Sequence, residues 1–384
     1  MDSSMEQGQL FSADSHVNEP PEVWDRIPAN LRVRGPHFVQ DPPGLKGLYI
    51  VFEGHEPDPV GMTFTAGIDK AEGGIRRVIE NFKWEDWRGP WDPKARLSDM
   101  DRDGVAMEVL YPSMARNLYT LKGDEIPLQM AAIQAYNDWL QGYCRTAPKR
   151  LVGLGLLSAL DAEWSVQELI RSRKLGHVGA LLPSELPAEL SYGDTAFDRL
   201  WATAQDMGVP IHFHAGIIQG RDRSRLKTVT DVERGLNSMR RAIVEPLTVL
   251  TQLIFGGVLE RFPQLRVVLA EYDLCWLHPF LTKMDASLRK SESQTRNAAK
   301  FSALPSDYVK RQVYATFQED RIGVLGAEVF DMLENYMWAS DYPHGNSTWP
   351  HSRAAIKAQF HGLPDQVQRK LTWENAAKLY ATVR

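Results

Sequence analysis

The strongest constraint on the fold is a series of short apolar segments rich in Val, Leu and Ile, several of them separated by amphipathic stretches long enough for a helix. This alternation is typical of parallel strands joined by helices. The predicted strands are residues 9–14, 105–111, 151–157, 178–182, 210–214, 266–271, 312–317 and 336–340. Eight strands in a chain of 384 residues favour an α/β fold of one TIM-type (β/α)₈ barrel. A doubly wound sheet usually has about five to seven strands and a glycine-rich first turn, which is absent here.

Two stretches are too long for ordinary connections within a single domain spanning residues 1–384. Residues 20–96 are dense in Pro, Gly and Trp, and we expect them to form an insertion over the barrel mouth after strand one. Residues 216–241 are irregular, polar and basic, with Arg221, Arg223 and Arg225 close together. Loops of this length at the catalytic face are usually lids or substrate walls, although a surface excursion is the alternative. Residues 198–207 and 247–259 are predicted to be helical.

Composition excludes several classes of partner. The chain is 43% hydrophobic and 24% charged, with a net charge of −5 and no basic stripe, so neither nucleic acid nor an anionic membrane is an expected partner. The polar N-terminus does not resemble a signal peptide, and no apolar run approaches the roughly 18 residues of a membrane span. We therefore expect a cytoplasmic protein that acts on a small molecule. Cys144 and Cys275 are the only cysteines, so a metal site must use His and carboxylates.

Polar residues follow three of the predicted strands at the end where a barrel builds its active site. Asp14 and His16 end the first strand and leave on the same face, because side chains alternate along a strand. His212 and His214 lie in strand five, and Asp341 follows strand eight. A helix cap or a buried core histidine explains each of these residues singly. Together they supply the N and O ligands of a catalytic Zn²⁺, Mn²⁺ or Fe²⁺ site.

These residues belong to motifs that resemble the amidohydrolase superfamily, in particular the branch with aminocarboxymuconate-semialdehyde, resorcylate and carboxyvanillate decarboxylases. The similar motifs are Asp14-Ser15-His16-Val17-x-Glu19-Pro20, Pro210-x-x-x-His214, Glu260-Arg261-Phe262-Pro263-Gln264-Leu265, Ser340-Asp341-Tyr342-Pro343-His344 and Glu374-Asn375-Ala376-Ala377-Lys378-Leu379-Tyr380. The resemblance implies that Asp14, His16, His214 and Asp341 bind one divalent metal, with Asp341 also handling protons. Zinc is the first expectation and manganese or iron the alternatives. The family also implies a homo-oligomer.

Two departures from the family pattern bear on the reaction. Asp14 stands where many relatives have the first histidine of a His-x-His pair, and Glu271 stands where the decarboxylases have a histidine after strand six. An imidazole can protonate a carbanion near neutral pH, whereas a carboxylate usually stays anionic unless burial raises its pKa. Glu271 is therefore expected to be catalytic, or alternatively to orient His214 or the metal-bound water.

The residues thus favour a metal-dependent hydrolase that activates a metal-bound water against a C–N, C–O or C–C bond of a small aromatic or cyclic substrate. Asp341, Glu271 and His344 are the expected catalytic residues, and His212 and Arg116 are expected to contact substrate. One alternative is a non-oxidative decarboxylase (a carboxy-lyase) or hydratase of an aromatic or unsaturated acid. Another is a catalytically silent barrel that binds a small molecule. Three tryptophans of the insertion either line an apolar pocket wall or pack the insertion: Trp84, Trp87 and Trp91.

Overall fold

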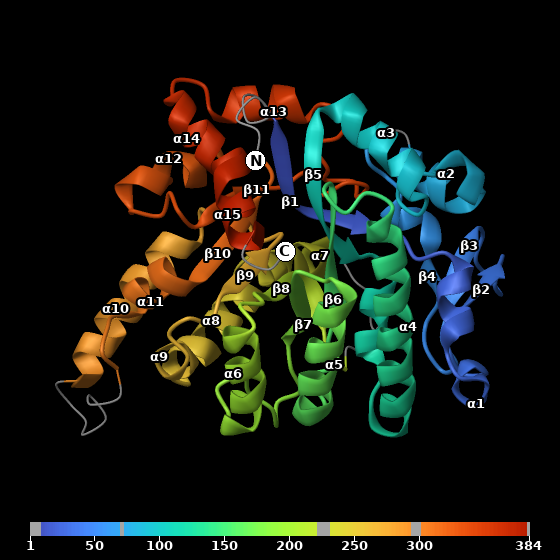
Figure 1. Cartoon of the computed structure of the whole chain (residues 1–384). Coiled ribbons are helices and arrows are strands. Elements are labelled where there is room, and N and C mark those ends of the chain that lie inside the picture. The colour runs from blue at the N-terminus through green and yellow to red at the C-terminus, as the bar shows by residue number, and fades with distance from the viewer. Residues whose placement is uncertain (1–8, 70–72, 221–230, 293–300, 382–384) are drawn as a thin grey trace.

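The computed structural model describes residues 9–69, 73–220, 231–292 and 301–381 and shows a barrel of eight parallel strands surrounded by helices (Figure 1). In sheet order the strands are β1 Leu10–Val17, β5 Val105–Pro112, β6 Leu151–Leu156, β7 Gly179–Glu185, β8 Ile211–Ile218, β9 Val267–Ala270, β10 Val313–Phe317 and β11 Tyr336–Trp338. All eight predicted strands are confirmed, with ends that differ by a few residues. Within these residues, no helix combines the length and hydrophobicity that a membrane crossing requires.

The sheet closes because its first and last strands meet. The N–H of Asp341, just after β11, donates to the carbonyl of Asp14 at 2.9 Å, and the N–H of His16 donates to the carbonyl of Tyr342 at 2.6 Å. The carboxyl ends of β1 and β11 therefore lie side by side. The two predicted ligand segments that are farthest apart in the chain become neighbours at this junction.

The helices between strands begin and end where the sequence provides caps. The Asp92 side chain accepts hydrogen bonds from two N–H groups at the start of α3 (Pro93–Asp103), and Gly104 ends this helix with a φ of 75°. The other principal helices of the barrel are α4 Ile126–Arg145, α5 Ala162–Leu175, α6 Asp198–Asp206, α8 Glu245–Phe255, α10 Leu277–Glu292, α11 Pro305–Gln312, α12 Arg321–Val329 and α15 Asn375–Ala381. The predicted helix at 198–207 is α6. The predicted helix at 247–259 is mostly α8, which ends before Gly257 and is followed by α9 Val258–Arg261.

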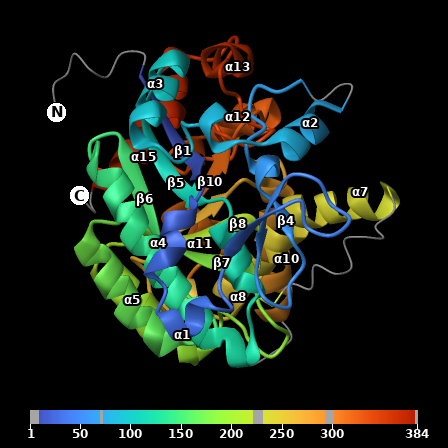
Figure 2. The same ribbon diagram turned by 90° about the vertical axis from the view of Figure 1, so that its right-hand side faces the viewer.

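The insertion after β1 forms a small three-stranded antiparallel sheet and several short helices. Its strands are β2 His37–Gln40, β3 Leu48–Val51 and β4 Asp58–Pro59, and its longest helix is α2 Gly74–Asn81. It lies at one side of the barrel in Figure 1 and faces the viewer in Figure 2. The N–H groups of Thr65 and Ala66 donate to the carbonyl of Pro343 at 3.1 and 2.9 Å, so the insertion reaches the carboxyl end of β11. Because α3 begins at Pro93, the last residues of the predicted range 20–96 belong to that helix.

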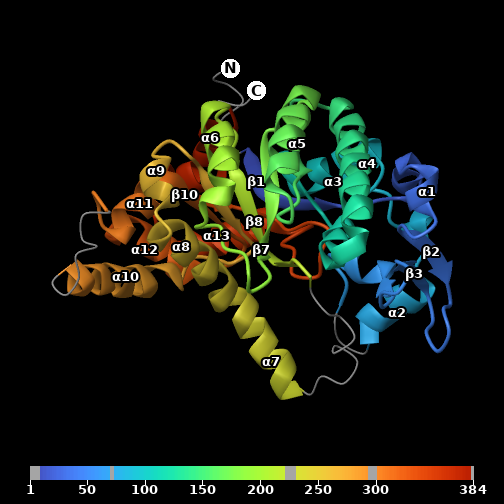
Figure 3. The ribbon, with the colours of Figure 1, turned by 90° about the horizontal axis from the view of Figure 1, so that it is seen from below.

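The second irregular stretch is partly helical, so the expectation of irregular structure is wrong for residues 231–241. Helix α7 (Asp231–Met239) continues through a π-helical turn, Arg240–Val244, into α8. Figure 3 shows α7 extending away from the barrel. Its apolar residues Val232, Leu236 and Met239 recur at helical spacing and are exposed, and this period is hard to see among the polar residues around it. Arg221, Arg223 and Arg225 lie outside the described residues.

Candidate metal centre

The structure brings the four predicted ligands together at the carboxyl end of the barrel. The two imidazole Nε2 atoms of His16 and His214 lie 3.2 Å apart. Asp14 lies between them, with one oxygen 3.4 Å from His16 Nε2 and the other 3.4 Å from His214 Nε2. Asp341 Oδ1 lies 3.3 Å from His16 Nε2. All four side chains are buried; Asp14, His16 and His214 form one group that could hold an ion, and Asp341 adjoins it through His16, with which it forms a second group that includes His344.

The hydrogen bonds of both histidines orient them for metal binding. His16 Nδ1 lies 3.0 Å from the carbonyl of Pro112, and His214 Nδ1 lies 3.0 Å from the carbonyl of Ala215. Because a carbonyl only accepts, each Nδ1 must carry the hydrogen. In a neutral ring the Nε2 atom then holds a lone pair that points at the centre.

The carboxylates fit a cation better than any protein partner that the described residues offer. Both oxygens of Asp14 and both oxygens of Asp341 are buried without a hydrogen bond from that part of the chain. A buried carboxylate without a partner is costly, and such groups are normally paired or bind metal. Two neutral imidazoles with two carboxylates suit Zn²⁺, Mn²⁺ or Fe²⁺. Asp14, His16, His214 and Asp341 are therefore the residues that would hold the ion.

Burial and the close contacts within the cluster shift the pKa values of its four groups in different directions. Burial raises the pKa of Asp14 and lowers the pKa of His16. Burial alone would lower the pKa of His214, but the carboxylate of Asp14, helped by Glu271 and Asp341, outweighs it and raises this pKa to about 9. Burial also opposes ionisation of Asp341, yet the neighbouring His344 and His16 keep its pKa below the usual range. A cation entering the centre would displace the proton that His214 otherwise holds.

Glu271 and an arginine that sequence reasoning did not single out lie beside the centre. Glu271 follows β9, has a φ of 63°, and places Oε2 3.5 Å from His214 Nε2. Arg241, in the π-helical turn before α8, places Nη2 3.9 Å from the same Glu271 oxygen. Its guanidinium lies against Gly216, where a Cβ atom would come within 3.1 Å of Arg241 Nε. Arg241 is thus a positively charged group at the edge of the metal centre.

His344 belongs to the centre. Its Nδ1 lies 3.0 Å from Asp341 Oδ1, and its ring lies 3.9 Å from that of His16 between centroids. Its Nε2 lies 3.1 Å from the hydroxyl of Ser113. His344 and Asp341 therefore form a pair through which a proton can move.

The two residues expected to bind substrate lie farther from the ligands. His212 is fully buried one layer deeper in the barrel, where its Nδ1 lies 2.6 Å from Tyr111 Oη, and burial lowers its pKa to about 3. It supports Tyr111, whose ring lies 5.1 Å from that of His214. Arg116 is one-third exposed and lies 4.0 Å from Asp58 of the insertion. Contact of either residue with substrate stays a prediction.

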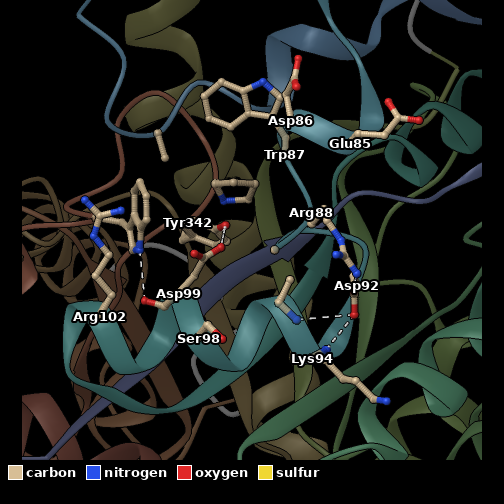
Figure 4. Close-up of a pocket in the computed structure, with 15 residues that line it drawn as sticks. Glu85, Asp86, Trp87, Arg88, Asp92, Lys94, Ser98, Asp99, Arg102 and Tyr342 are labelled. Atoms are coloured by element: carbon tan, nitrogen blue, oxygen red, sulfur yellow. Dashed lines mark hydrogen bonds and ion pairs between the residues drawn. The ribbon is translucent and has the colours of Figure 1, made fainter.

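A cavity of about 670 Å³ lies on the outer side of Tyr342, between α3 and the insertion (Figure 4). Tyr342 Oη donates to Asp99 Oδ2 at 2.5 Å, and Trp349 Nε1 donates to the carbonyl of Asp99 at 3.2 Å. Trp87 lines this cavity.

Trp84 and Trp91 instead pack against each other inside the insertion, with ring centroids 6.1 Å apart. Phe64 and Phe82 extend this cluster, with centroids 5.7 and 5.3 Å from that of Trp84. The packing interpretation therefore holds for these two tryptophans.

Comparisons with known proteins bear on the family and the fold of this chain. A family model described as Amidohydrolase matches residues 13–382. The 2-amino-3-carboxymuconate-6-semialdehyde decarboxylase of Dictyostelium discoideum is 28% identical over 181 residues, which are 47% of this chain and 47% of the relative. The match thus spans about half the length of that curated relative.

Solved structures with the same fold cover almost the whole chain. An amidohydrolase of Mycobacterium avium subsp. paratuberculosis K-10 has a TM-score of 0.76 and 20% identity, covering 97% of this chain and 99% of its own. A 5-carboxyvanillate decarboxylase from Novosphingobium aromaticivorans, solved in complex with manganese and 4-hydroxy-3-methoxy-5-nitrobenzoic acid, has a TM-score of 0.69 and 18% identity, covering 99% of this chain and 97% of its own. At these identities the likeness shows the fold alone.

Proposed function

Because the match over residues 13–382 shows that this chain belongs to the amidohydrolase family, we propose that it is a metal-dependent carboxy-lyase of a small aromatic or unsaturated carboxylic acid. The observation that carries the proposal is the cluster of two histidines and two buried carboxylates that accept no hydrogen bond from the described residues, with Arg241 at its edge. The relatives support this alternative better than the hydrolase favoured by the sequence, since the Dictyostelium and Novosphingobium proteins are both decarboxylases. Manganese, one of the metals expected from the sequence, is bound in the 5-carboxyvanillate decarboxylase, and we propose it here ahead of zinc and iron.

The residues of the site have distinct tasks in this reaction. When bound, a divalent cation would supply a Lewis acid that holds a substrate oxygen and stabilises developing negative charge. Arg241 would bind the substrate carboxylate by charge-assisted hydrogen bonds. As carbon dioxide leaves, the electrons of the broken C–C bond stay on carbon, which must receive a proton. Asp341 and His344, whose facing atoms lie 3.0 Å apart, would hold and deliver that proton.

A hydrolase is the second candidate, and Glu271 is the observation that favours it. Hydrolysis needs a base that takes a proton from the attacking water, and a carboxylate beside His214 fits this role. In a carboxy-lyase the same carboxylate would instead balance the charge of Arg241 beside the ligand atom of His214.

The test compares both reactions on one preparation. Protein reconstituted with Mn²⁺ or Zn²⁺ is assayed for carbon dioxide release from hydroxylated benzoic acids and unsaturated acids, and in parallel for cleavage of amides, esters and lactones. Metal-dependent carbon dioxide release supports the carboxy-lyase. Turnover of the amides, esters or lactones alone would contradict the carboxy-lyase and support the hydrolase. No turnover of any substrate would support a barrel that binds a small molecule without catalysis.

We expect Arg241→Ala to raise KM for an acid substrate by about 10–100-fold, since a hydrogen bond between charged groups contributes about 1.5–3 kcal/mol. Mn²⁺ affinity should stay unchanged because Arg241 faces Glu271 and not the four ligands. The neighbouring Arg240, which binds Glu185 at 2.6 Å, provides the matched control Arg240→Ala. If KM rises equally in both variants, the rise reflects a disturbed π-helical turn and not the loss of the Arg241 side chain.

Glu271→Gln separates the two roles of Glu271. For a carboxy-lyase we expect Mn²⁺ affinity to fall about 10-fold, since a negative charge 3.5 Å from the ligand atom His214 Nε2 is lost, while kcat at saturating Mn²⁺ changes less. Titration of metal-free protein with Mn²⁺, followed by kinetics at saturation, measures both quantities. A fall of kcat by about 10²–10⁴-fold at saturating Mn²⁺ would contradict this expectation and identify Glu271 as a general acid–base group.

A further inference from the structure

A connected set of buried polar side chains lies behind the metal ligands and takes no part in the reaction described above. We call it the Arg96 network; its members are Arg96, Glu108, Ser12, Ser15 and Ser340, each at most 2% exposed. They come from α3, β5, β1 and the residue before Asp341. The network therefore spans the junction where the first and last strands of the barrel meet.

Three serine hydroxyls tie the two sides of this junction together. The Oγ atoms of Ser12, Ser15 and Ser340 lie 2.9–3.1 Å from one another. Ser12 Oγ also donates to the carbonyl of Asp14 at 2.8 Å and accepts from the N–H of Ser340 at 2.8 Å. The register between β1 and β5 shifts between Ser12 and Ser15, so an extra residue of β1 is accommodated where the serines meet.

Arg96 is the member that contacts both ligand-bearing segments. Its Nη1 donates to the carbonyl of His16 at 2.7 Å, and its guanidinium lies 4.6 Å from the ring centroid of Tyr342, the residue after Asp341. Its Nε donates to Glu108 Oε2 at 2.6 Å, and the other oxygen of Glu108 accepts from Ser15 at 3.2 Å. The planar guanidinium thus holds a carbonyl, a carboxylate and a ring at once.

Tyr342 is held from its other side by the same helix. Its hydroxyl donates to Asp99, one turn after Arg96 in α3, at the wall of the outer cavity (Figure 4). Two residues of helix α3 therefore contact Tyr342, one at its ring and the other at its hydroxyl group. Rotation or displacement of Asp341, the neighbouring residue, is restricted by both contacts.

Stability alone does not account for a buried ion pair at this place. Two charges lose their hydration on burial, and well-packed apolar side chains of similar volume often stabilise a protein as well or better. Apolar side chains, however, cannot hold the carbonyl of His16 at a fixed distance from the carboxylate of Glu108. The ion pair therefore fixes the positions of two segments that carry proposed metal ligands.

We propose that Arg96 is a positioning residue of the metal centre, which fixes the main chain at His16 and the ring of Tyr342 so that the ligands from β1 and from beyond β11 match one ion. Arg96 contacts neither the ion nor the substrate. The inference rests on the metal centre of the proposed function and not on which reaction the enzyme catalyses.

The test measures Mn²⁺ affinity of the metal-free protein by the electron paramagnetic resonance signal of free Mn²⁺. The double variant Arg96→Met/Glu108→Leu removes both buried charges, so no unpaired charge remains to unfold the chain. We expect its affinity to fall about 10–100-fold, as for other groups that orient ligands, with an unchanged circular dichroism spectrum. Arg96→Lys keeps a positive charge beside Glu108, and this variant replaces the double variant in the test if the double variant does not fold. Its single ammonium group cannot hold all three partners, so its affinity should also fall about 10-fold.

The matched control is Glu168→Gln, in another buried cluster away from the centre. Glu168 is 1% exposed and accepts hydrogen bonds from Asn137 and Arg171 at 2.7 Å. This variant should unfold at a lower temperature but bind Mn²⁺ as the wild type does. If the folded Arg96 variants bind Mn²⁺ as tightly as the wild type, the proposal for Arg96 is overturned and the metal centre stands. A wild-type protein that binds none of Mn²⁺, Zn²⁺ and Fe²⁺ would overturn both.

Discussion

Asp341→Asn is expected to lower kcat by about 10³-fold or more, because it removes one charged ligand and one partner of the proton-transfer pair at a single position. The backbone should tolerate the change. Asp341 has a φ of 57°, a left-handed conformation that Asn adopts readily. The measurement is kcat at saturating Mn²⁺, together with the circular dichroism spectrum to show that the fold is retained.

The chain offers a close control for this substitution. Asp331 has the same φ of 57° but lies on the surface, where it forms an ion pair with Lys310 at 3.3 Å. Asp331→Asn makes the same chemical change in the same backbone conformation and should leave kcat unchanged. Near-normal turnover of Asp341→Asn would remove Asp341 from the catalytic machinery.

Removal of the metal is expected to abolish turnover and to lower the unfolding temperature. The four oxygens of Asp14 and Asp341 then remain buried without a hydrogen bond, with only the neighbouring histidines to balance their charge. An ion at about 1,000 times its Kd stabilises the folded chain by about 4 kcal/mol, which for a protein of this size is roughly 5 °C. Calorimetry of chelator-treated protein with and without Mn²⁺ measures the shift.

Two further results check that the shift comes from this centre. Added Mn²⁺ should restore both turnover and the unfolding temperature, whereas a variant with Asp14→Asn should respond much less to the same addition. Chelator-treated protein that keeps full activity and an unchanged unfolding temperature would show that no metal is required.

The fold and the ligand cluster were accessible from sequence for the same reason. The strands are short and largely apolar, three of them end in or are followed by distinctive polar residues, and parallel strands in a barrel bring those ends together. Asp14, His16, His214 and Asp341 could therefore be grouped without any contact information. The position of His212 could not, because a histidine two residues earlier lies about 7 Å farther down the strand, and alternation does not distinguish depth.

Arg96 was missed, and Arg241 was not singled out among the arginines after strand five, because their environments depend on contacts between distant segments. Within α3, nothing local distinguishes the fully buried Arg96 from Arg102, whose guanidinium lies over the Trp349 ring. The main-chain partner of Arg96, His16, is 80 residues away. The choice of reaction was affected in the same way. Glu271 was interpreted from its residue type alone, whereas its role also depends on the charge of Arg241, which lies 3.9 Å away.

The two hydrogen bonds at the closure of the barrel, from Asp341 to Asp14 and from His16 to Tyr342, join segments that are synthesised far apart in time. Two ligands are synthesised among the first residues of the chain and one near its end. A nascent chain that stops before β11 therefore has its first strand without the neighbour that closes the ring, and it lacks a carboxylate of the centre. With the proposed ligands, uptake of the ion would therefore require that β1 and the segment after β11 have both been made and have paired.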